Sequence, residues 1–400
     1  MPAVKRVVCV QERLLRYRIP FFDLLRRTLI EDGIALDVRY GAASETLALR
    51  EDSGNLSWGT YVHNRHFRLG TAHEAVWQPV ISATRQADLV IVDQASRLLV
   101  NYVLLARQRF GGPPVALWGH GANLQPDGSV LSRVGESVKR RYSQVPHWWF
   151  AYTEGTARRV AGLGFPRHRI TVVQNAVDTA SLQRWYDAVT PAEAAQAHVG
   201  LGPTGRSTCV YIGSLYPNKR IGFLLEAAEV IAAAVPDFEL VVVGSGPDQE
   251  TVRRAAARLP WLHHRGAVFG REKAVLARTS QLLLMPGAVG LGILDSFSFQ
   301  LPMVTTSEAL HGPEIEYLRD GVNGLMAGPG GTPQAYARTV IALLRDPARI
   351  GRLKSGCAVS ARTYTLDAMV QRFAEGVRGA LHRTEREPRL SITGVPRPGR

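Results

Sequence analysis

The stretch PGAVGLGILDSFSFQLPMVTT, residues 286–306, is crowded with glycines and contains one lone acidic residue. Gly287, Gly290 and Gly292 expose backbone N–H groups and carry no side chains that would block a ligand. A glycine loop that leads into a helix presents oriented N–H groups to an anion such as a phosphate. Asp295 lies in the first turn of the expected helix, as a partner of the helix dipole or as an acceptor for ligand hydroxyls. We therefore expect a nucleotide's diphosphate near the glycines and its ribose near Asp295.

A second loop with suitable residues follows the apolar run TCVYIG, residues 208–213. Gly213 lets the chain leave a strand tightly, and Ser214 comes next. Lys219 and Arg220 stand just before the next helical pattern. Lys219 is either a phosphate ligand in a cleft or a solvated loop lysine, and the loop alone does not decide between them.

Two more strand ends carry candidate residues. Gly244 opens the segment GSGPDQ, which lacks the third glycine and the later acidic residue of a dinucleotide-binding loop. We expect a tight turn there that lets a ligand approach the backbone. His120 lies between two glycines in WGHGANLQ, directly after the apolar run VALWG. It is either a structural histidine or a hydrogen-bonding partner of a substrate sugar.

The elements that must position these residues alternate along the chain, with short apolar runs between longer helical patterns. Continuous apolar runs of this kind are typical of parallel strands buried on both faces. The pattern predicts an α/β fold with two doubly wound, Rossmann-like sheets. The predicted strands are residues 6–10, 35–40, 88–93, 115–119, 150–153, 170–174, 208–213, 239–244, 281–285 and 303–306.

Small, polar, Gly and Pro residues with little periodicity place a seam near residues 180–206. We therefore expect two domains, 1–185 and 186–364, whose strand ends face a common cleft. A helical segment at 365–382 is expected to pack back on the first domain. We expect residues 383–400, which are rich in Pro and Arg, to be disordered.

Composition indicates a soluble globular protein of 400 residues, of which 46% are hydrophobic and 20% charged. Cys9, Cys209 and Cys357 are far apart, and we expect them to be reduced core residues of a cytoplasmic protein. No apolar run approaches the length of about 18 residues that a membrane-spanning helix needs, and none at the start resembles a secretory signal.

The net charge of +14 indicates an attraction to polyanions, which include nucleic acids, anionic lipids and phosphorylated substrates. No nucleic-acid-binding motif accompanies the charge, so we do not expect nucleic acid as a partner. The segment SVKRRYSQVPHWWF, residues 137–150, mixes cations with aromatic residues. It is either a surface that lies on an anionic membrane or a solvated helix followed by a buried aromatic strand.

Taken together, these motifs resemble the retaining glycosyltransferases of the family 4 type, which have the two-domain GT-B fold. The resemblance extends from about residue 5 to residue 380 and is strongest in 208–330. Its segments are YIGSLYPNKRIGFLLEA, VVVGSGP, PGAVGLGILDSFSFQLPMVTT and EYLRDGVNGLMAGP in the second half, and YRIPFFDLL, LWGHG and VVQNAVDT in the first.

The resemblance implies that the second domain binds a nucleotide-sugar donor and the first domain an acceptor. Lys219 matches the family's diphosphate-binding lysine, and Asp295 matches the second acid of its two-glutamate motif, which contacts the donor ribose. The backbone from Val289 to Leu291 matches the loop that meets the donor sugar and phosphate. His120 matches a cleft histidine that contacts the transferred sugar.

The sequence departs from the family pattern at two positions. Gly287 replaces the first glutamate of the motif, which normally touches hydroxyls of the transferred sugar. Ser214 replaces an arginine that usually accompanies the lysine, and Arg220 is the nearest candidate to compensate for it. The donor's sugar must therefore be held differently, or differ in kind.

The resemblance implies transfer of a sugar to an acceptor hydroxyl with retention, in the synthesis of a polysaccharide, a glycolipid or a cell-envelope glycan. The acceptor is expected to be a glycan, a lipid-linked group or a small molecule. We expect no metal site and no cofactor other than the donor substrate. The alternative is a catalytically degenerate protein of the same fold that binds a nucleotide sugar without turnover.

Overall fold

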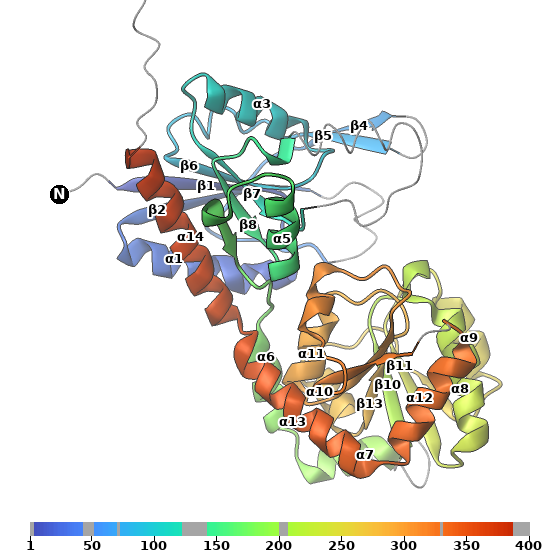
Figure 1. Cartoon of the computed structure of the whole chain (residues 1–400). Coiled ribbons are helices and arrows are strands. Elements are labelled where there is room, and N and C mark those ends of the chain that lie inside the picture. The colour runs from blue at the N-terminus through green and yellow to red at the C-terminus, as the bar shows by residue number, and fades with distance from the viewer. Residues whose placement is uncertain are drawn as a thin grey trace, which may run out of the picture. The chain divides into compact units, whose positions relative to one another are not determined.

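The computed structural model describes residues 4–42, 52–69, 73–121, 142–199, 207–328 and 331–386. The chain divides into two compact units, which are shown in Figure 1. Unit 1 contains residues 1–174 and 367–400, and unit 2 contains residues 175–366. The first passage between units therefore falls at residue 174, ahead of the boundary at residue 185 that the sequence suggested.

Unit 1 is built on a seven-stranded sheet in the order β3-β2-β1-β6-β7-β8-β9, with each recorded strand pair parallel. Its strands are β1 (Lys5–Arg13), β2 (Ile34–Gly41), β3 (Thr60–Tyr61), β6 (Leu89–Asp93), β7 (Val115–Gly119), β8 (Trp148–Ala151) and β9 (Ile170–Val172). An antiparallel hairpin of β4 (Arg65–Leu69) and β5 (His73–Trp77) stands apart from this sheet. Its helices are η1 (Arg16–Arg18), α1 (Ile19–Glu31), α3 (Leu99–Arg109), α5 (Glu154–Gly162), η2 (Arg167–Arg169) and α14 (Leu366–Arg386).

Unit 2 is built on a six-stranded parallel sheet in the order β12-β11-β10-β13-β14-β15. Its strands are β10 (Ser207–Ile212), β11 (Phe238–Val243), β12 (Leu262–His264), β13 (Leu282–Leu284), β14 (Met303–Thr306) and β15 (Gly324–Ala327). Its helices are α6 (Thr179–Asp187), α7 (Pro191–Val199), η3 (Pro217–Lys219), α8 (Ile221–Ala234), α9 (Gln249–Ala256), α10 (Gly270–Arg278), α11 (Gly292–Ser298), η4 (Pro313–Tyr317), α12 (Pro333–Leu344) and α13 (Pro347–Thr363).

The apolar runs are continuous because the side chains on both faces of these strands are buried. Every residue of β7 and of β10 is buried, which is what a parallel strand between two layers of helices requires. Both sheets therefore have the Rossmann-like winding that the sequence predicts. β8 begins at Trp148 rather than at residue 150, because Trp148 and Trp149 belong to the same buried run.

Helix α14 completes unit 1 with residues from the far end of the chain. Phe373 is fully buried, stacks on Phe150 at a centroid distance of 4.2 Å, and also contacts Trp118 and Phe21. Figure 1 shows α14 running next to α1, which contributes Phe21 to this cluster. The helix extends to Arg386, so residues 383–386 of the expected disordered tail are helical. The remainder of that tail lies outside the described residues.

The prediction for the cysteines is confirmed, because Cys9, Cys209 and Cys357 are all buried and carry free thiols.

The seam predicted near residues 180–206 is not irregular throughout, because α7 forms within it. Its first turn is held by Thr190 and Glu193, whose backbone N–H groups each donate to the other's side chain.

Candidate functional site

The loops with candidate residues in unit 2 meet at the point where its strand order reverses. β10 and β13 are neighbours in the sheet, but the chain leaves them toward opposite edges, with β11 on one side and β14 on the other. Such a switch point opens a crevice at the carboxyl ends of the two strands, where α/β folds bind ligands. The segment that follows β10 contains Lys219, and the segment that follows β13 is the glycine loop, residues 286–292.

The loop after β10 is fastened to the loop after β11 by backbone hydrogen bonds. The N–H of Leu215 donates to the carbonyl of Ser245 at 2.8 Å, and the N–H of Asp248 donates to the carbonyl of Leu215 at 2.9 Å. A Cβ on Gly244 would overlap the carbonyl oxygen of Gly213. Gly244 is therefore required by the packing of these two loops, a reason that the sequence alone does not show.

Lys219 lies at the end of η3 and reaches across to the glycine loop. Its Nζ donates a hydrogen bond to the carbonyl oxygen of Ala288. Burial lowers the pKa of the Lys219 ammonium from its ordinary value, because a charge out of water is costly. A half-buried ammonium next to backbone amides is a favourable place for a phosphate anion.

Two neighbours of Lys219 differ from what the family pattern suggests. The side chain of Ser214 is exposed, and its carbonyl oxygen accepts a hydrogen bond from the Tyr211 hydroxyl at 2.8 Å. Arg220 adopts the left-handed conformation with φ +57°, and its guanidinium stacks 4.1 Å from the centre of the Phe223 ring. It also donates to Thr306 Oγ1 at 3.3 Å. Arg220 thus ties α8 to the end of β14 in this structure.

Gly287 occupies a place in which no side chain fits. A Cβ at this position would lie 2.5 Å from Lys219 Cα and closer still to the Lys219 carbonyl group. The adjacent N–H of Ala288 donates to the carbonyl of Asn218 at 2.9 Å, which holds the loop against η3. The backbone packing at position 287 therefore excludes the glutamate that stands there in the family pattern.

The segment after β14, residues 307–314, is also hydrogen-bonded to the glycine loop. The backbone N–H of Val289 donates to His311 Nδ1 at 3.1 Å, and the N–H of Gly312 donates to the Val289 carbonyl at 2.6 Å. Both backbone groups of Val289 are therefore engaged within the protein. Of the expected sugar- and phosphate-binding residues Val289, Gly290 and Leu291, the first therefore has its N–H directed to His311.

Asp295 lies in the first turn of α11 and forms an ion pair with Lys273 of α10 at 3.0 Å. Only 15% of the Lys273 side chain and 18% of the Asp295 side chain are exposed. One Asp295 oxygen is held by this lysine, and a carboxylate has further lone pairs that can accept ligand hydroxyls. The dipole contribution expected at this helix is small, because α11 has only seven residues.

His120 directly follows β7 in unit 1, as predicted. Its ring packs against Tyr152 at a centroid distance of 5.8 Å, and its carbonyl accepts a hydrogen bond from Arg159 at 3.5 Å. The flanking glycines have separate packing reasons: a Cβ on Gly119 would lie 2.7 Å from Gln94 Cβ, and Gly121 has φ +75°. The structure thus places His120 in unit 1 and the other candidate residues in unit 2.

A polar cluster that the sequence analysis missed lies at the corresponding switch point of unit 1, between β1 and β6. The partly buried Asp93 carboxylate accepts hydrogen bonds from Gln11 Nε2 at 2.7 Å and from the Glu12 backbone at 3.2 Å. Burial raises the pKa of Asp93 to about 6, and the nearby negative charge of Glu12 contributes. Arg18 lies buried with its guanidinium 4.4 Å from the Trp118 ring. The sequence did offer a signal for this cluster, because Asp93 is the last residue of its strand and ligand sites lie at strand ends.

Lys273, His311 and Glu314 were also missed. Lys273 lies on a helix whose sequence shows only an amphipathic pattern, so nothing local indicated its ion pair. His311 and Glu314 follow β14 by a few residues, in the same way that the glycine loop follows β13. Both residues could have been found from the sequence, by examining the residues that follow the predicted strand 303–306.

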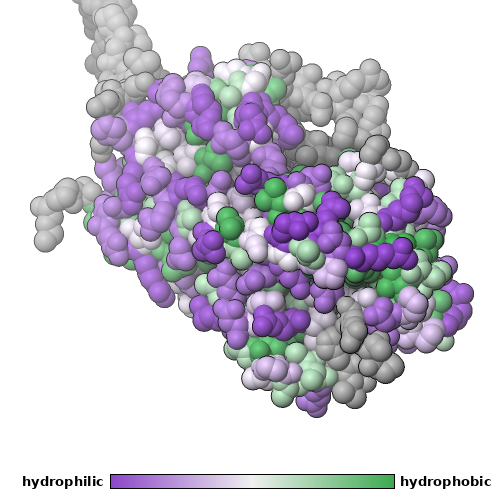
Figure 2. Space-filling view, turned by 60° about the horizontal axis from the view of Figure 1, so that its bottom comes forward, coloured by the Kyte–Doolittle hydropathy of each residue, from purple (hydrophilic) through white to green (hydrophobic). Residues whose placement is uncertain are grey.

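The aromatic part of the expected membrane surface is a buried strand. Trp149 and Phe150 are fully buried in β8, and Trp148 is 9% exposed. The basic residues Lys139, Arg140 and Arg141 lie outside the described residues. On the face drawn in Figure 2, hydrophilic residues predominate and hydrophobic residues form small groups. Within the described part of the chain, no helix has both the length and the apolar character needed to cross a bilayer.

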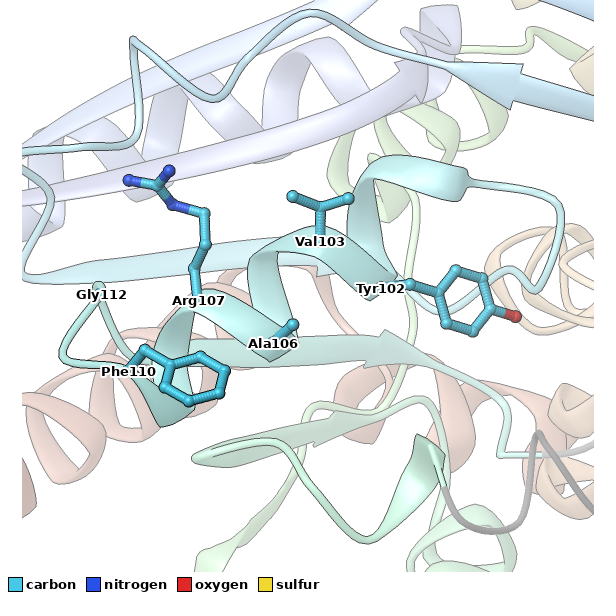
Figure 3. A pocket seen from close by; sticks show the side chains of 6 residues that line it. All are labelled: Tyr102, Val103, Ala106, Arg107, Phe110 and Gly112. Atoms are coloured by element: carbon cyan, nitrogen blue, oxygen red, sulfur yellow. The ribbon is translucent and has the colours of Figure 1, made fainter.

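Two hollows are recorded in unit 1. One, of about 560 Å³, runs along α3 and is lined mainly by apolar groups, including Phe110, which is 74% exposed (Figure 3). It lies away from the carboxyl ends of the strands, because Phe110 and Gly112 precede β7. The other, of about 480 Å³, is lined by residues that include Leu14, Tyr40 and Gly41. Since these residues end or follow β1 and β2, this second hollow lies at the edge where His120 and Asp93 are found.

Comparison with known proteins gives a family for unit 2. Residues 206–346 match the family described as glycosyl transferases group 1. An alpha-D-kanosaminyltransferase of Streptomyces kanamyceticus is 23% identical over 315 residues, which are 76% of this chain and 74% of that protein. A D-inositol 3-phosphate glycosyltransferase of Thermobispora bispora is 25% identical over 236 residues, which are 55% of this chain and 53% of that protein.

Solved structures share the fold along nearly the whole chain. The Anabaena protein HepE, solved in complex with UDP-glucose, superposes with a TM-score of 0.66 at 16% identity. The match covers 93% of this chain and 99% of that one. Sucrose-phosphate synthase of Thermosynechococcus elongatus superposes with a TM-score of 0.66 at 12% identity, over 95% of this chain and 100% of that one. Residues 206–346 therefore match the glycosyl transferases group 1 family, and the chain has the GT-B fold.

Proposed function

We propose that this glycosyltransferase moves a sugar from a nucleoside-diphosphate sugar to an acceptor hydroxyl with retention of anomeric configuration. The observation that carries the proposal is the meeting of Lys219 with the glycine loop at the switch point of unit 2. An ammonium and backbone amides in one crevice suit a diphosphate. Asp295 would accept hydrogen bonds from the donor ribose on the same side of the sheet. HepE, which was solved with UDP-glucose, has the same fold.

The reaction breaks the bond between the sugar's anomeric carbon and a phosphate oxygen, and negative charge develops on the departing diphosphate. Lys219 and the amides of Gly290 and Leu291 would stabilise that charge, which is worth most where water is excluded. The acceptor oxygen bonds to the same face of the anomeric carbon, and its proton passes to the leaving phosphate oxygen. No enzyme carboxylate acts as nucleophile in this scheme.

We further propose that the acceptor binds to unit 1, at the strand ends that carry His120. The acceptor would be a hydroxyl of a glycan, a lipid-linked sugar or a small molecule, and the setting would be polysaccharide, glycolipid or cell-envelope glycan synthesis. One similar protein, from Streptomyces kanamyceticus, is named as an alpha-D-kanosaminyltransferase. The donor charge would be neutralised by protein groups alone, so transfer should continue in excess chelator.

A thermal-shift panel tests the donor proposal. UDP, GDP, dTDP, CMP, NAD and the corresponding sugar conjugates are added to the wild type, to Lys219→Ala and to Asp295→Ala. A ligand at about 100 times its Kd stabilises the native state by about 2.7 kcal/mol, which raises Tm by several degrees. We expect one nucleoside diphosphate and its conjugates to raise Tm in the wild type, and the rise to be lost in both variants.

Arg258→Ala is the matched control, because it removes an exposed cation from unit 2 away from the crevice. Its Tm rise should equal that of the wild type. If no ligand in the panel shifts the wild type, the donor proposal is wrong. If a donor binds but no sugar is transferred to any acceptor tried, the chain is the catalytically degenerate form, which the packing of Gly287 would then explain.

A further inference from the structure

The glycine loop lacks the carboxylate of the family pattern, and its backbone leaves no room for one. Gly287 is packed against Lys219, so a glutamate there would displace η3 or the loop itself. A hexose presents several hydroxyls that donate hydrogen bonds, and carboxylates are the strongest acceptors among side chains. If this loop binds a transferred sugar, the acceptor for those hydroxyls has to come from another element.

A buried carboxylate does lie against the same loop. Glu314 is the second residue of η4 and is 4% exposed. A Cβ on Gly290 would lie 4.0 Å from Glu314 Oε2, and a Cβ on Gly312 would lie 2.9 Å from the same oxygen. The carboxylate thus lies beside Gly290, at the centre of the glycine loop.

The segment that carries Glu314 is fixed to the loop. Its neighbour Gly312 donates through its N–H to the carbonyl of Val289 at 2.6 Å, and the Val289 N–H donates to His311 Nδ1 at 3.1 Å. A side chain at position 312 would strike Glu314 or the backbone of Val289 and Gly290, so glycine is needed there. The carboxylate is consequently held at a constant distance from the loop.

The orientation of the carboxylate is also fixed. Asn175 Nδ2 donates to Glu314 Oε1 at 2.6 Å, and Asn175 is 1% exposed. The Tyr317 hydroxyl of the same 3-10 helix donates to the carbonyl of Asn175 at 3.2 Å. The Asn175 amide therefore anchors Oε1, while Oε2 is the oxygen that is turned toward Gly290 and Gly312.

We propose that Glu314 takes over the role of the missing glutamate and accepts hydrogen bonds from hydroxyls of the transferred sugar. A carboxylate has about four lone-pair sites, so Glu314 can accept a hydrogen bond from a sugar hydroxyl on the side of Gly290 in addition to its bonds within the protein. This inference rests on the proposed function, because it presupposes a nucleotide-sugar donor at the loop. It adds a specificity-determining residue on an element outside the two-glutamate motif.

The proposal predicts a difference between ligands that have the sugar and ligands that lack it. Glu314→Gln keeps the shape and an oxygen for Asn175 but removes the charge. Binding is measured by calorimetry for three pairs: UDP with UDP-glucose, GDP with GDP-mannose and dTDP with dTDP-glucose. For the pair that binds the wild type, we expect affinity for the sugar conjugate to fall by about tenfold or more, equivalent to about 1.4 kcal/mol. Affinity for the free nucleotide should stay within about twofold.

Glu316→Gln is the matched control, because it removes the same charge from an exposed position of the same 3-10 helix. It should leave both affinities unchanged. Glu314→Asp keeps the charge but withdraws it by one methylene, and it is expected to lose part of the conjugate affinity. It also serves as the second variant if the glutamine form does not fold.

Two results would overturn the proposal. Equal losses for nucleotide and conjugate would show that Glu314 only supports the loop, and an unchanged conjugate affinity would show that the sugar is held elsewhere. Failure of the donor site itself looks different, because then the wild type binds neither member of any pair. In that case the proposed function is wrong, and the role of Glu314 is wrong with it.

Discussion

His311 connects the end of β14 to the glycine loop through both of its ring nitrogens. Nδ1 accepts the hydrogen bond from the Val289 N–H, so it carries no proton, and Nε2 lies 2.6 Å from the carbonyl oxygen of Thr306. The ring is therefore neutral, with its proton on Nε2. Burial is the main reason why the pKa of His311 is lowered from its ordinary 6.5, and the positive charge of Lys219 lowers it further.

We expect this arrangement to make the proposed donor site sensitive to acid. The unfolded chain binds a proton on His311 more readily than the folded chain, so the histidine contributes stability above about pH 6.5 that is lost as the pH falls through its folded-state pKa. We expect Tm and nucleotide affinity of the wild type to decrease between about pH 6.5 and pH 5. Both are measured by thermal shift at constant ionic strength.

His311→Gln supplies the comparison, because its amide does not titrate in this range. The variant should have lower affinity at neutral pH and a shallower decrease toward acid. The same slope in both proteins would mean that another group titrates, and Glu314 and Lys219 are the charged neighbours to examine next.

At the scale of elements, the proposed donor site is made by four segments, those after β10, β11, β13 and β14, which fit against one another through glycines. Gly244 allows the loop after β11 to touch the loop after β10, and Gly287 allows the loop after β13 to touch η3. Gly312 allows the segment after β14 to close on Val289 and Gly290. The crevice is therefore shaped by contacts between backbones, in which one methyl group is too large.

A substitution in the glycine loop tests this packing. Gly287→Ala places a methyl group against the backbone of Lys219, and we expect a loss of about 1–3 kcal/mol in the free energy of unfolding, as for other overpacked sites. Urea unfolding followed by circular dichroism measures it. Gly292→Ala is the control in the same loop, since its methyl would meet only the flexible Met285 side chain, at 3.7 Å. Equal stability of the two variants would contradict the steric explanation.

At the scale of the whole molecule, unit 1 is made from both ends of the chain. The sheet of unit 1 is formed by residues before 175, but α14 returns after unit 2 and inserts Phe373 among Phe21, Trp118 and Phe150. Trp118 is the strand residue two places before His120. The C-terminal helix therefore supports the strand end that carries His120.

Phe373→Ala should therefore destabilise unit 1 and leave unit 2 intact. Truncation of a fully buried phenylalanine costs about 3–5 kcal/mol. Scanning calorimetry is expected to show a transition at lower temperature, while the nucleotide binding that we propose for unit 2 persists below that transition. Glu375→Ala, an exposed change two residues along the same helix, should alter neither. A Phe373 variant as stable as the wild type would show that the aromatic cluster adds little.

The sequence by itself determined the two parallel sheets, the strands on which they rest and the candidate residues that follow them. It could do so because burial on both faces leaves a continuous apolar run, and because ligand sites of such sheets lie at strand ends. It did not reveal β12, β15 or the β4–β5 hairpin, whose short strands carry too weak a pattern. At position 287 the sequence showed that the glutamate is missing, but it did not show that a side chain there would strike Lys219.

Only the tertiary structure decided which candidates act together. It showed that Asp295 is paired with Lys273, that Arg220 is engaged by Phe223 and Thr306, and that Val289 is held by His311. It also brought Glu314 to the side of Gly290. These relations join residues on different elements, and their distances follow from backbone packing at the sheet edge. The local sequence pattern does not contain the distances between residues of different elements. The same residue types at the same spacing are compatible with many arrangements of the loops.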